Sequence, residues 1–317
     1  MKFRHFALTG AISIIGAMHS RCNFFHQSTT TKQIGLNTFD SSVEQQITVF
    51  YNIYTAKAGD ISTVKQIVEE QLRDLRPHHE VHVRSIGEQF EIPNTTRIRH
   101  DQTGNEIETL ELLWKHCHKH PASRVVYIHS KGSFHSRPEN TRLRRFLTRG
   151  ALSDACSFLP EECNVCSSRM SPFPHPHTPG NMWLARCSYV KNLLNPLIFE
   201  VAMEETEYLG DVNKAAPWCL GRGRFAAEHW IHSHPSVQPC DVAGDEIAYF
   251  WGYNGVPDHE FPFNLSTAPR FPLHAYASIG GCNLLTGDSN MSAYSTIRRI
   301  EYEWLYGENS LEKWWDN

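Results

Sequence analysis

The sequence lacks the short motifs that mark the best-known catalytic and nucleotide-binding sites. It contains no G-x-S-x-G nucleophile elbow, no H-E-x-x-H zinc motif, no P-loop and no G-x-G-x-x-G fingerprint. Internal repeats and low-complexity tracts are also absent. Any functional site must therefore be inferred from less specific patterns.

The chain also lacks an excess of basic residues. Its formal net charge is -4 at pH 7, and its isoelectric point is about 6.5. A general nucleic-acid binder needs a broad basic surface, so we expect no nucleic-acid partner. The chain has 317 residues, of which 40% are hydrophobic and 20% charged, which is typical of a globular protein with one large domain or two small ones.

The N-terminus lacks an apolar run of the ~20 residues that cross a bilayer comfortably. The run from Phe6 to Met18 is shorter; it follows Lys2 and Arg4 and precedes Arg21. This order is typical of a secretory signal, although no small-x-small cleavage site follows. We expect residues 1–20 to be a signal peptide or a short signal-anchor, which would be a possible membrane anchor. The alternative is a buried helix of a cytosolic domain.

Nine cysteines and three Asn-x-Ser/Thr sequons agree with entry into the secretory pathway. If Cys22 lies in or near the signal, the other eight cysteines could form four disulfide bonds. Cys163-Asn-Val-Cys166 is a C-x-x-C pair, and we expect its two cysteines to bond to different partners. No second C-x-x-C follows, so half a zinc site is less favoured. The sequons begin at Asn94, Asn264 and Asn290.

Composition divides the chain into four parts. Residues 1–20 are the signal or anchor, and the polar residues 21–46 predict a stem or linker. Residues 47–240 hold the predicted folded domain. In the C-terminal extension, residues 241–317, proline and glycine become frequent and the periodicity fades, so we expect irregular structure.

Strands and helices alternate along the predicted domain, which indicates an α/β fold. Asn94 to Gly104 is predicted to be a loop. The order of the elements predicts a Rossmann-like domain with a mostly parallel central sheet and helices on both faces. Strands are predicted at 47–54, 80–86 and 125–128, and helices at 61–75, 106–118, 143–158, 188–194 and 225–231.

The strongest candidate site directly follows the strand at 125–128. Open α/β sheets bind ligands at the carboxyl edge of their strands. Gly132 permits a positive φ, so the turn could bring backbone N–H groups towards a phosphate, and Lys131 supplies a mobile charge. We predict an anionic ligand such as a diphosphate; the alternative is a core strand followed by a solvated basic helix. The residues assigned to this site are His129, Ser130, Lys131, Gly132, Arg144 and Arg145.

Two further segments could contribute to the same site. Gly180 and Asn181 suggest close backbone approach with a two-way hydrogen-bonding amide, and Trp183 could be a stacking platform or simply a core residue. Glu228 lies among apolar and aromatic neighbours, where its carboxylate could serve as a base. The alternative for Glu228 is a surface ion pair with Arg224 at helical i,i+4 spacing.

Two H-x-H pairs are candidate zinc ligands, because alternate side chains of a strand share one face. Both pairs adjoin prolines, which leaves their geometry open. The four histidines are His175, His177, His232 and His234.

Three short motifs occur in order: Tyr127-Ile-His-Ser-Lys-Gly132, Gly180-Asn-Met-Trp-Leu-Ala185 and Ala227-Glu-His-Trp230. With them the chain, from about Ile47 to Pro239, resembles glycosyltransferase-like proteins with a GT-A type domain. Relatives of this kind occur in bacterial polysaccharide synthesis and among uncharacterised algal proteins. The resemblance implies a GT-A-like fold and a nucleotide-sugar co-substrate.

The resemblance also implies roles for the three motifs. Glu228 stands where an inverting enzyme of this fold keeps its base, and the Gly180-Asn181 segment would border the donor sugar or the acceptor. His229 and Trp230 join the predicted substrate-binding set. The family's Asp-x-Asp is replaced here by His129-Ser-Lys131. A Mg²⁺ or Mn²⁺ clamp is therefore disfavoured, and cationic side chains could neutralise the leaving diphosphate instead.

Three functions follow as expectations. The first is a glycosyltransferase that moves a sugar from a nucleotide-sugar to a glycan or protein acceptor. It would be a type II protein of the Golgi lumen or membrane, or a secreted protein. The second is a non-catalytic glycan-binding luminal domain of the same fold. The third is a zinc-dependent hydrolase that uses the four histidines.

Overall fold

The computed structural model describes residues 46–55, 61–170, 177–205, 223–234, 236–243 and 266–267. The predicted parts 1–20 and 21–46, apart from residue 46, and most of 241–317 lie outside this range. The elements in chain order are β1 (Ile47–Tyr54), α1 (Ile61–Leu72), β2 (His79–Ile86), β3 (Thr96–Asp101), α2 (Ile107–Lys119), β4 (Arg124–His129), α3 (Pro138–Ala151), α4 (Asp154–Ser157), β5 (Val165–Ser167), β6 (Trp183–Arg186), α5 (Cys187–Val190), α6 (Pro196–Glu205), η2 (Gly223–Phe225), α8 (Ala226–Trp230), β7 (Pro239–Asp241) and β8 (Ser266–Thr267).

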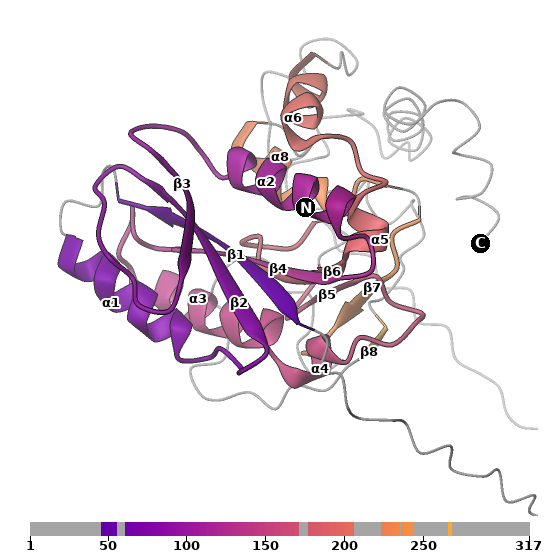
Figure 1. Cartoon of the computed structure of the whole chain (residues 1–317), viewed down its shortest axis with the longest axis horizontal. Helices are drawn as coiled ribbons and strands as arrows, with labels where there is room; N and C mark the ends of the chain where they lie inside the picture. The colour runs from indigo at the N-terminus through magenta and orange to yellow at the C-terminus, as the bar shows by residue number, and fades with distance from the viewer. Residues whose placement is uncertain are drawn as a thin grey trace, which may run out of the picture. The chain divides into compact units, whose positions relative to one another are not determined.

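One mixed sheet runs through the fold in the order β3-β2-β1-β4-β6-β5-β7-β8 (Figure 1). The strands β3, β2, β1 and β4 run parallel to one another, whereas β6 is antiparallel to both of its neighbours, β4 and β5. The α/β class is thus confirmed, and the sheet is mixed. Asn52 lies opposite His129 in register, so the carboxyl ends of β1 and β4 lie side by side.

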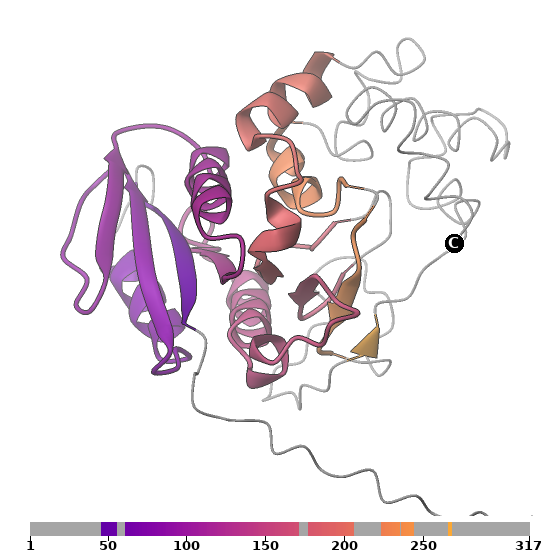
Figure 2. The same cartoon turned by 45° about the vertical axis from the view of Figure 1, so that its right-hand side comes forward.

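Helices cover both faces of the sheet, because the central strands are apolar on both sides. Ile47, Val49, Tyr51 and Ile53 point to the face covered by α1 and α3, whereas Phe50 points to the face covered by α2. In Figures 1 and 2, α2, α6 and α8 lie together on one side, and α1 and α3 lie on the other. Two hydrophobic cores therefore hold the sheet from both sides.

Strand β3 corrects the predicted loop at 94–104. It is an edge strand paired with β2, and its only apolar side chain is Ile98. The strand is held by its backbone pairing with β2 and by two side-chain contacts, Asp101 with Arg84 and His100 with Ser85. It has no apolar pattern from which the sequence could predict it. A second difference concerns the helix predicted at 188–194: the helix α5 ends at Val190, and a further helix, α6, begins at Pro196.

Three disulfide bonds connect the elements. Cys117–Cys187 joins α2 to α5, Cys156–Cys166 joins α4 to β5, and Cys163–Cys240 anchors β7. The two cysteines of the C-x-x-C pair do have different partners, as predicted. These bonds fit an oxidising secretory or extracellular environment. The remaining cysteines, Cys22, Cys219 and Cys282, lie outside the described residues.

The described residues bear on two features linked to secretion, membrane-spanning helices and the three sequons. Across the ranges given above, no helix is long and apolar enough to cross a membrane. Asn94 is exposed, in the turn that precedes β3, and the sequons at Asn264 and Asn290 lie outside the described residues.

Candidate functional site

Two glycine turns meet at the carboxyl edge of β4. In the first, Ser133 N donates to Ser130 O at 3.0 Å, and Gly132 has a φ of 88°. In the second, Asn181 N donates to Thr178 O at 2.9 Å. There Pro179 and Gly180 occupy the central positions and Gly180 has a φ of 76°, the pattern of a type II turn. Both glycines thus have the positive φ that their turns require.

The Gly180 turn brings Lys131 and Glu228 to one place. A Cβ atom on Gly180 would lie 3.2 Å from Lys131 Cε, so the lysine side chain packs directly over this glycine. Gly180 N donates to Glu228 Oε1 at 3.2 Å. We call Glu106, His129, Lys131, Gly180, Asn181 and Glu228 the Gly180 cluster.

Glu228 lies in α8 and is half-buried. The ion pair with Arg224 that was the alternative for this residue does not form; the Arg224 guanidinium instead lies 4.7 Å from the Phe225 ring centre. Thr178 N also donates to the Glu228 carbonyl at 3.4 Å. Backbone and side chain of Glu228 are thus both tied to the turn, although α8 is distant in sequence.

His129 is a neutral member of the cluster. Its Nε2 lies 2.7 Å from Gly180 O, and because a carbonyl can only accept, Nε2 carries the proton. Burial lowers the pKa of His129 to about 4, the Lys131 charge acts in the same direction, and the Gly180 bond and Glu228 oppose it. At neutral pH His129 therefore donates to the turn without adding charge.

Glu106 is a member that the sequence patterns did not single out. Its Oε2 accepts hydrogen bonds from Tyr127 OH at 3.0 Å and from Asn181 Nδ2 at 2.9 Å. Burial raises the pKa of Glu106, against the effects of these two donors and of the nearby Lys131 and Arg224 charges. A second carboxylate thus contacts the turn, at Asn181 beside the Gly180 contact of Glu228.

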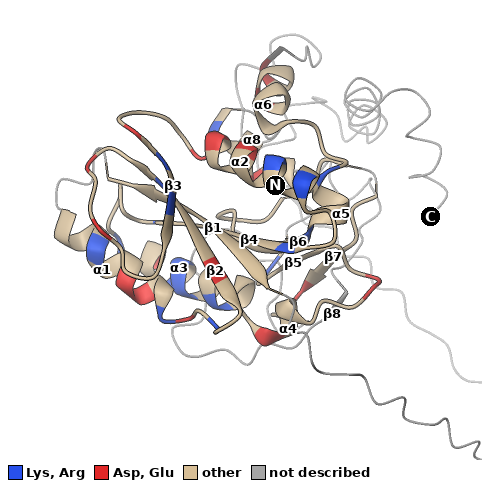
Figure 3. Cartoon of the chain, in the orientation of Figure 1, with Lys and Arg blue, Asp and Glu red and all other residues tan. Residues whose placement is uncertain are grey.

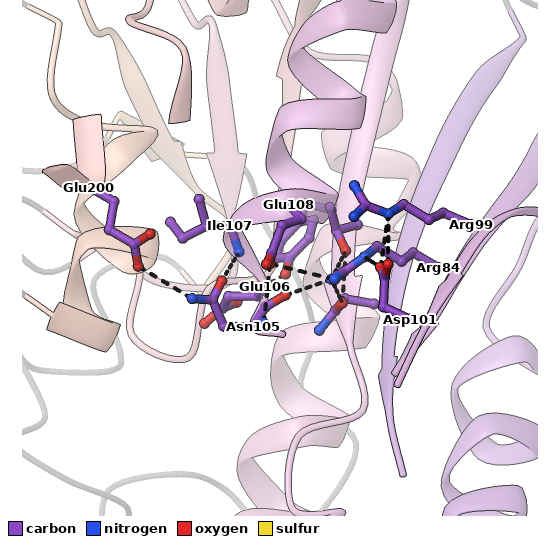
Figure 4. A network of polar contacts seen from close by, with 11 residues as sticks. Arg84, Arg99, Asp101, Asn105, Glu106, Ile107, Glu108 and Glu200 are labelled. Atoms are coloured by element: carbon purple, nitrogen blue, oxygen red, sulfur yellow. Dashed lines mark hydrogen bonds and ion pairs between the residues drawn. The ribbon is translucent and has the colours of Figure 1, made fainter. Parts of the chain in front are cut away.

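The start of α2 holds Glu106 in place. Asn105 Oδ1 accepts from Ile107 N at 2.8 Å, and Glu108 Oε2 accepts from Asn105 N at 3.1 Å. These two bonds tie Asn105 to the first turn of α2 on either side of Glu106, the N-cap residue, and their N-x-x-E spacing is visible in the sequence. The Asn105 side chain also donates to Glu200 of α6 (Figure 4). Glu106 lies between Asn105 and Glu108, with its side chain directed to Tyr127 and Asn181.

Buried Arg84 also fixes the segment at the start of α2. Its side chain is fully buried and donates to Asp101 Oδ2 at 2.8 Å and to Asn105 O at 2.6 Å (Figure 4). It also reaches Asn52, the residue of β1 beside His129. Because a buried arginine needs such partners, the arrangement connects the ends of β1, β2 and β3 with the start of α2.

A buried glutamine holds the end of β4 from the opposite face. Gln71 of α1 accepts from Tyr51 OH at 2.7 Å. Its amide nitrogen reaches His129 O at 3.1 Å and Thr148 Oγ1 at 2.8 Å. The backbone that presents His129 and Lys131 is thus anchored to two helices. Neither Gln71 nor Arg84 has a local sequence signal, because only the topology brings their partners together.

The predicted substrate-binding residues Trp183, His229 and Trp230 lie inside the core, each with 0% exposure. Of the two alternatives for Trp183, a stacking platform or a core residue, its burial fits the core residue. Its Nε1 donates to Asn181 Oδ1 at 2.8 Å. Asn181 itself has a φ of 49° and is 1% exposed. Trp183 thus positions the amide that bonds Glu106.

Arg144 and Arg145 of α3 belong to a different cluster. Arg145 makes two hydrogen bonds to Glu70 of α1, and Arg144 lies 3.4 Å from the same carboxylate. Figure 3 shows basic residues along α3 on this side of the sheet. Arg144 also donates to Lys131 O at 2.9 Å. Arg144 thus supports the backbone of the first turn, whereas the structure ties Arg145 to Glu70.

Two histidines of the predicted zinc site, His232 and His234, have other partners. His232 Nε2 lies 2.8 Å from Thr178 Oγ1, and His234 Nδ1 lies 2.8 Å from Ser236 Oγ. His177 is described, whereas His175 lies outside the described residues. Within the part of the chain that is described, no three His, Cys, Asp or Glu side chains are grouped so as to hold a metal ion.

Comparison with known proteins identifies a family. The domain of unknown function DUF8361 matches residues 50–317, which includes every member of the Gly180 cluster. The chain belongs to this family. No curated protein and no solved structure matches the chain. The DUF8361 match covers residues 50–317 and leaves the chemistry to be inferred from the cluster.

Proposed function

We propose that this DUF8361 protein is a glycosyltransferase-like enzyme of the secretory pathway, in the Golgi or secreted. It would transfer a sugar from a nucleotide-sugar to a glycan or protein acceptor. The observation that carries the proposal is the meeting of Lys131 and Glu228 at Gly180, beside the carboxyl ends of parallel strands β1 and β4. Ligands bind at this edge in open α/β sheets.

Each of the two side chains suits one half of the transfer. The Glu228 carboxylate would take the proton of an acceptor hydroxyl, and the acceptor oxygen would bond to the anomeric carbon. The bond from that carbon to the diphosphate oxygen breaks, and its electron pair leaves with the diphosphate. Lys131 would stabilise the resulting negative charge.

The surroundings favour this division of roles. His129 is neutral and occupied by the Gly180 carbonyl, so Lys131 is the cationic side chain of the cluster. Only one oxygen of Glu228 accepts a hydrogen bond from the described residues, which leaves the other for an acceptor hydroxyl. The hydrogen bond from Gly180 N–H holds one oxygen of the Glu228 carboxylate in place.

The substitution Glu228→Gln tests the proposal. Glutamine retains an acceptor for Gly180 N–H but cannot take a proton. Nucleoside diphosphate release from UDP-glucose, UDP-galactose, UDP-N-acetylglucosamine and GDP-mannose is measured with the purified chain. We expect turnover to fall about 100- to 10,000-fold, with nucleotide binding retained. Glu111→Gln, in the first half of α2 where Glu111 pairs with Lys115, is the matched control and should remain active. Unchanged turnover in Glu228→Gln would remove Glu228 from the role of base.

The second candidate is a glycan-binding domain without catalysis. It is favoured by the residues after β4, where His129-Ser-Lys131 offers none of the carboxylates that a metal-bound diphosphate would need. Thermal unfolding with nucleotides and with oligosaccharides separates the two candidates, because a ligand that prefers the native state raises the unfolding temperature. A shift with oligosaccharide and none with any nucleotide favours the glycan binder.

A further inference from the structure

Glu106 presents one carboxylate oxygen that the protein does not use. The Tyr127 hydroxyl and the Asn181 amide both donate to Oε2. No hydrogen bond from the described residues reaches Oε1, and Glu106 as a residue is half-buried. A carboxylate held on one oxygen, with the other open, is suited to accept hydrogen bonds from a ligand.

The parts that hold Glu106 are rigid. Tyr127 is fully buried in β4, and Asn181 is 1% exposed and held by Trp183 Nε1. The hydrogen bonds of Asn105 with Ile107 and Glu108, and the Arg84 contact to Asn105 O, fix the backbone around Glu106. Groups whose positions are fixed in this way lose little entropy when a ligand binds.

Charge decides which ligand groups suit Glu106. The Lys131 and Arg224 charges act on its carboxylate, so its negative charge is already balanced in part. A cationic ligand would meet those two positive charges. A neutral donor, such as a sugar hydroxyl, would meet neither repulsion nor a large desolvation cost.

We propose that Glu106 is the sugar-binding carboxylate of the Gly180 cluster and accepts hydrogen bonds from hydroxyls of the bound sugar. Glu228 and Glu106 are tied to adjacent residues of one turn, Gly180 and Asn181, so both carboxylates face the same ligand. This assignment rests on the proposed function for the identity of the ligand as a nucleotide-sugar.

Glu106→Gln is the sharpest variant. Its amide oxygen can replace Oε2 and accept from Tyr127 and Asn181, which places the NH₂ group where Oε1 was. The group that faces the ligand thus changes from an acceptor to a donor while the internal bonds remain. Glu111→Gln is again the matched control on the same helix, and thermal unfolding of both variants checks that they fold.

The measurement is calorimetric binding of UDP-glucose, UDP-galactose, UDP-N-acetylglucosamine and GDP-mannose, each compared with UDP or GDP alone. We expect Glu106→Gln to weaken binding of the preferred nucleotide-sugar roughly tenfold to a hundredfold and to leave binding of the nucleoside diphosphate unchanged. A merely structural role would weaken both ligands alike. Equal losses, or no loss for the nucleotide-sugar, would overturn the assignment.

A second arm separates this inference from the proposed function. Maltohexaose, cellohexaose and chitohexaose are titrated into the same proteins. If the wild type binds one of them and no nucleotide-sugar, and Glu106→Gln abolishes that binding, the transferase proposal fails and the role of Glu106 stands. Failure of the wild type to bind any sugar-containing probe contradicts both.

Discussion

Gly180 is constrained in two ways, by its backbone conformation and by the side chains packed against it. Gly180 has a φ of 76°, which side chains disfavour, and an added Cβ would lie 2.6 Å from Leu147 Cδ1 and 3.2 Å from Lys131 Cε. The sequence suggested close backbone approach here, because glycine precedes an amide and an aromatic residue. It did not suggest which side chain approaches, since Lys131 and Gly180 are neighbours only in the folded sheet.

Gly180→Ala should therefore destabilise the protein more than the same change at a glycine with positive φ but free space. Gly223 is that control, with a φ of 57° and a nearest atom 3.7 Å from the added Cβ. The left-handed conformation costs alanine about 1–2 kcal/mol at either position. We expect a further loss of about 1–3 kcal/mol at Gly180, because overpacking adds strain. Denaturant unfolding measures both variants; equal losses would show that the close contact is not maintained.

Elements differ in how much of their structure the sequence could predict. The strands β1 and β4 were predicted because they are apolar on both faces, as strands between two helical layers must be. The edge strand β3 was missed because it contains one apolar residue and is defined by pairing with β2. Glu106 was placed correctly at the start of a helix, but its role depends on Tyr127 and Asn181, which the fold brings from two other strands or turns.

Disulfide bonds between elements should contribute to the free energy of unfolding according to the length of chain that they enclose. Cys117–Cys187 spans 70 residues, whereas Cys156–Cys166 spans 10. Loop-closure entropy predicts that replacing the first pair by alanine costs about 4 kcal/mol and replacing the second about 3 kcal/mol. The free energy of unfolding of the two double variants, measured with denaturant, gives the comparison. A larger loss for the Cys156–Cys166 pair would mean that enclosed chain length does not govern these bonds.

The whole molecule joins residues from several parts of the chain at one edge of the sheet. The end of β4 supplies His129 and Lys131, the start of α2 supplies Glu106, and α8 supplies Glu228. The sequence could indicate the end of β4 and Glu228 separately, as polar residues beside apolar elements. Their common location depends on the order of strands in the sheet and on the turn at Gly180, which no local pattern encodes.

The most direct measurement of the central claim is a crystal structure of the full chain with UDP or GDP bound. The account predicts a diphosphate at the carboxyl ends of β1 and β4, within hydrogen-bonding distance of Lys131 Nζ and on the same side of the sheet as Glu228. A nucleotide bound away from the Gly180 cluster, with Lys131 and Glu228 making no contact to it, would contradict the account.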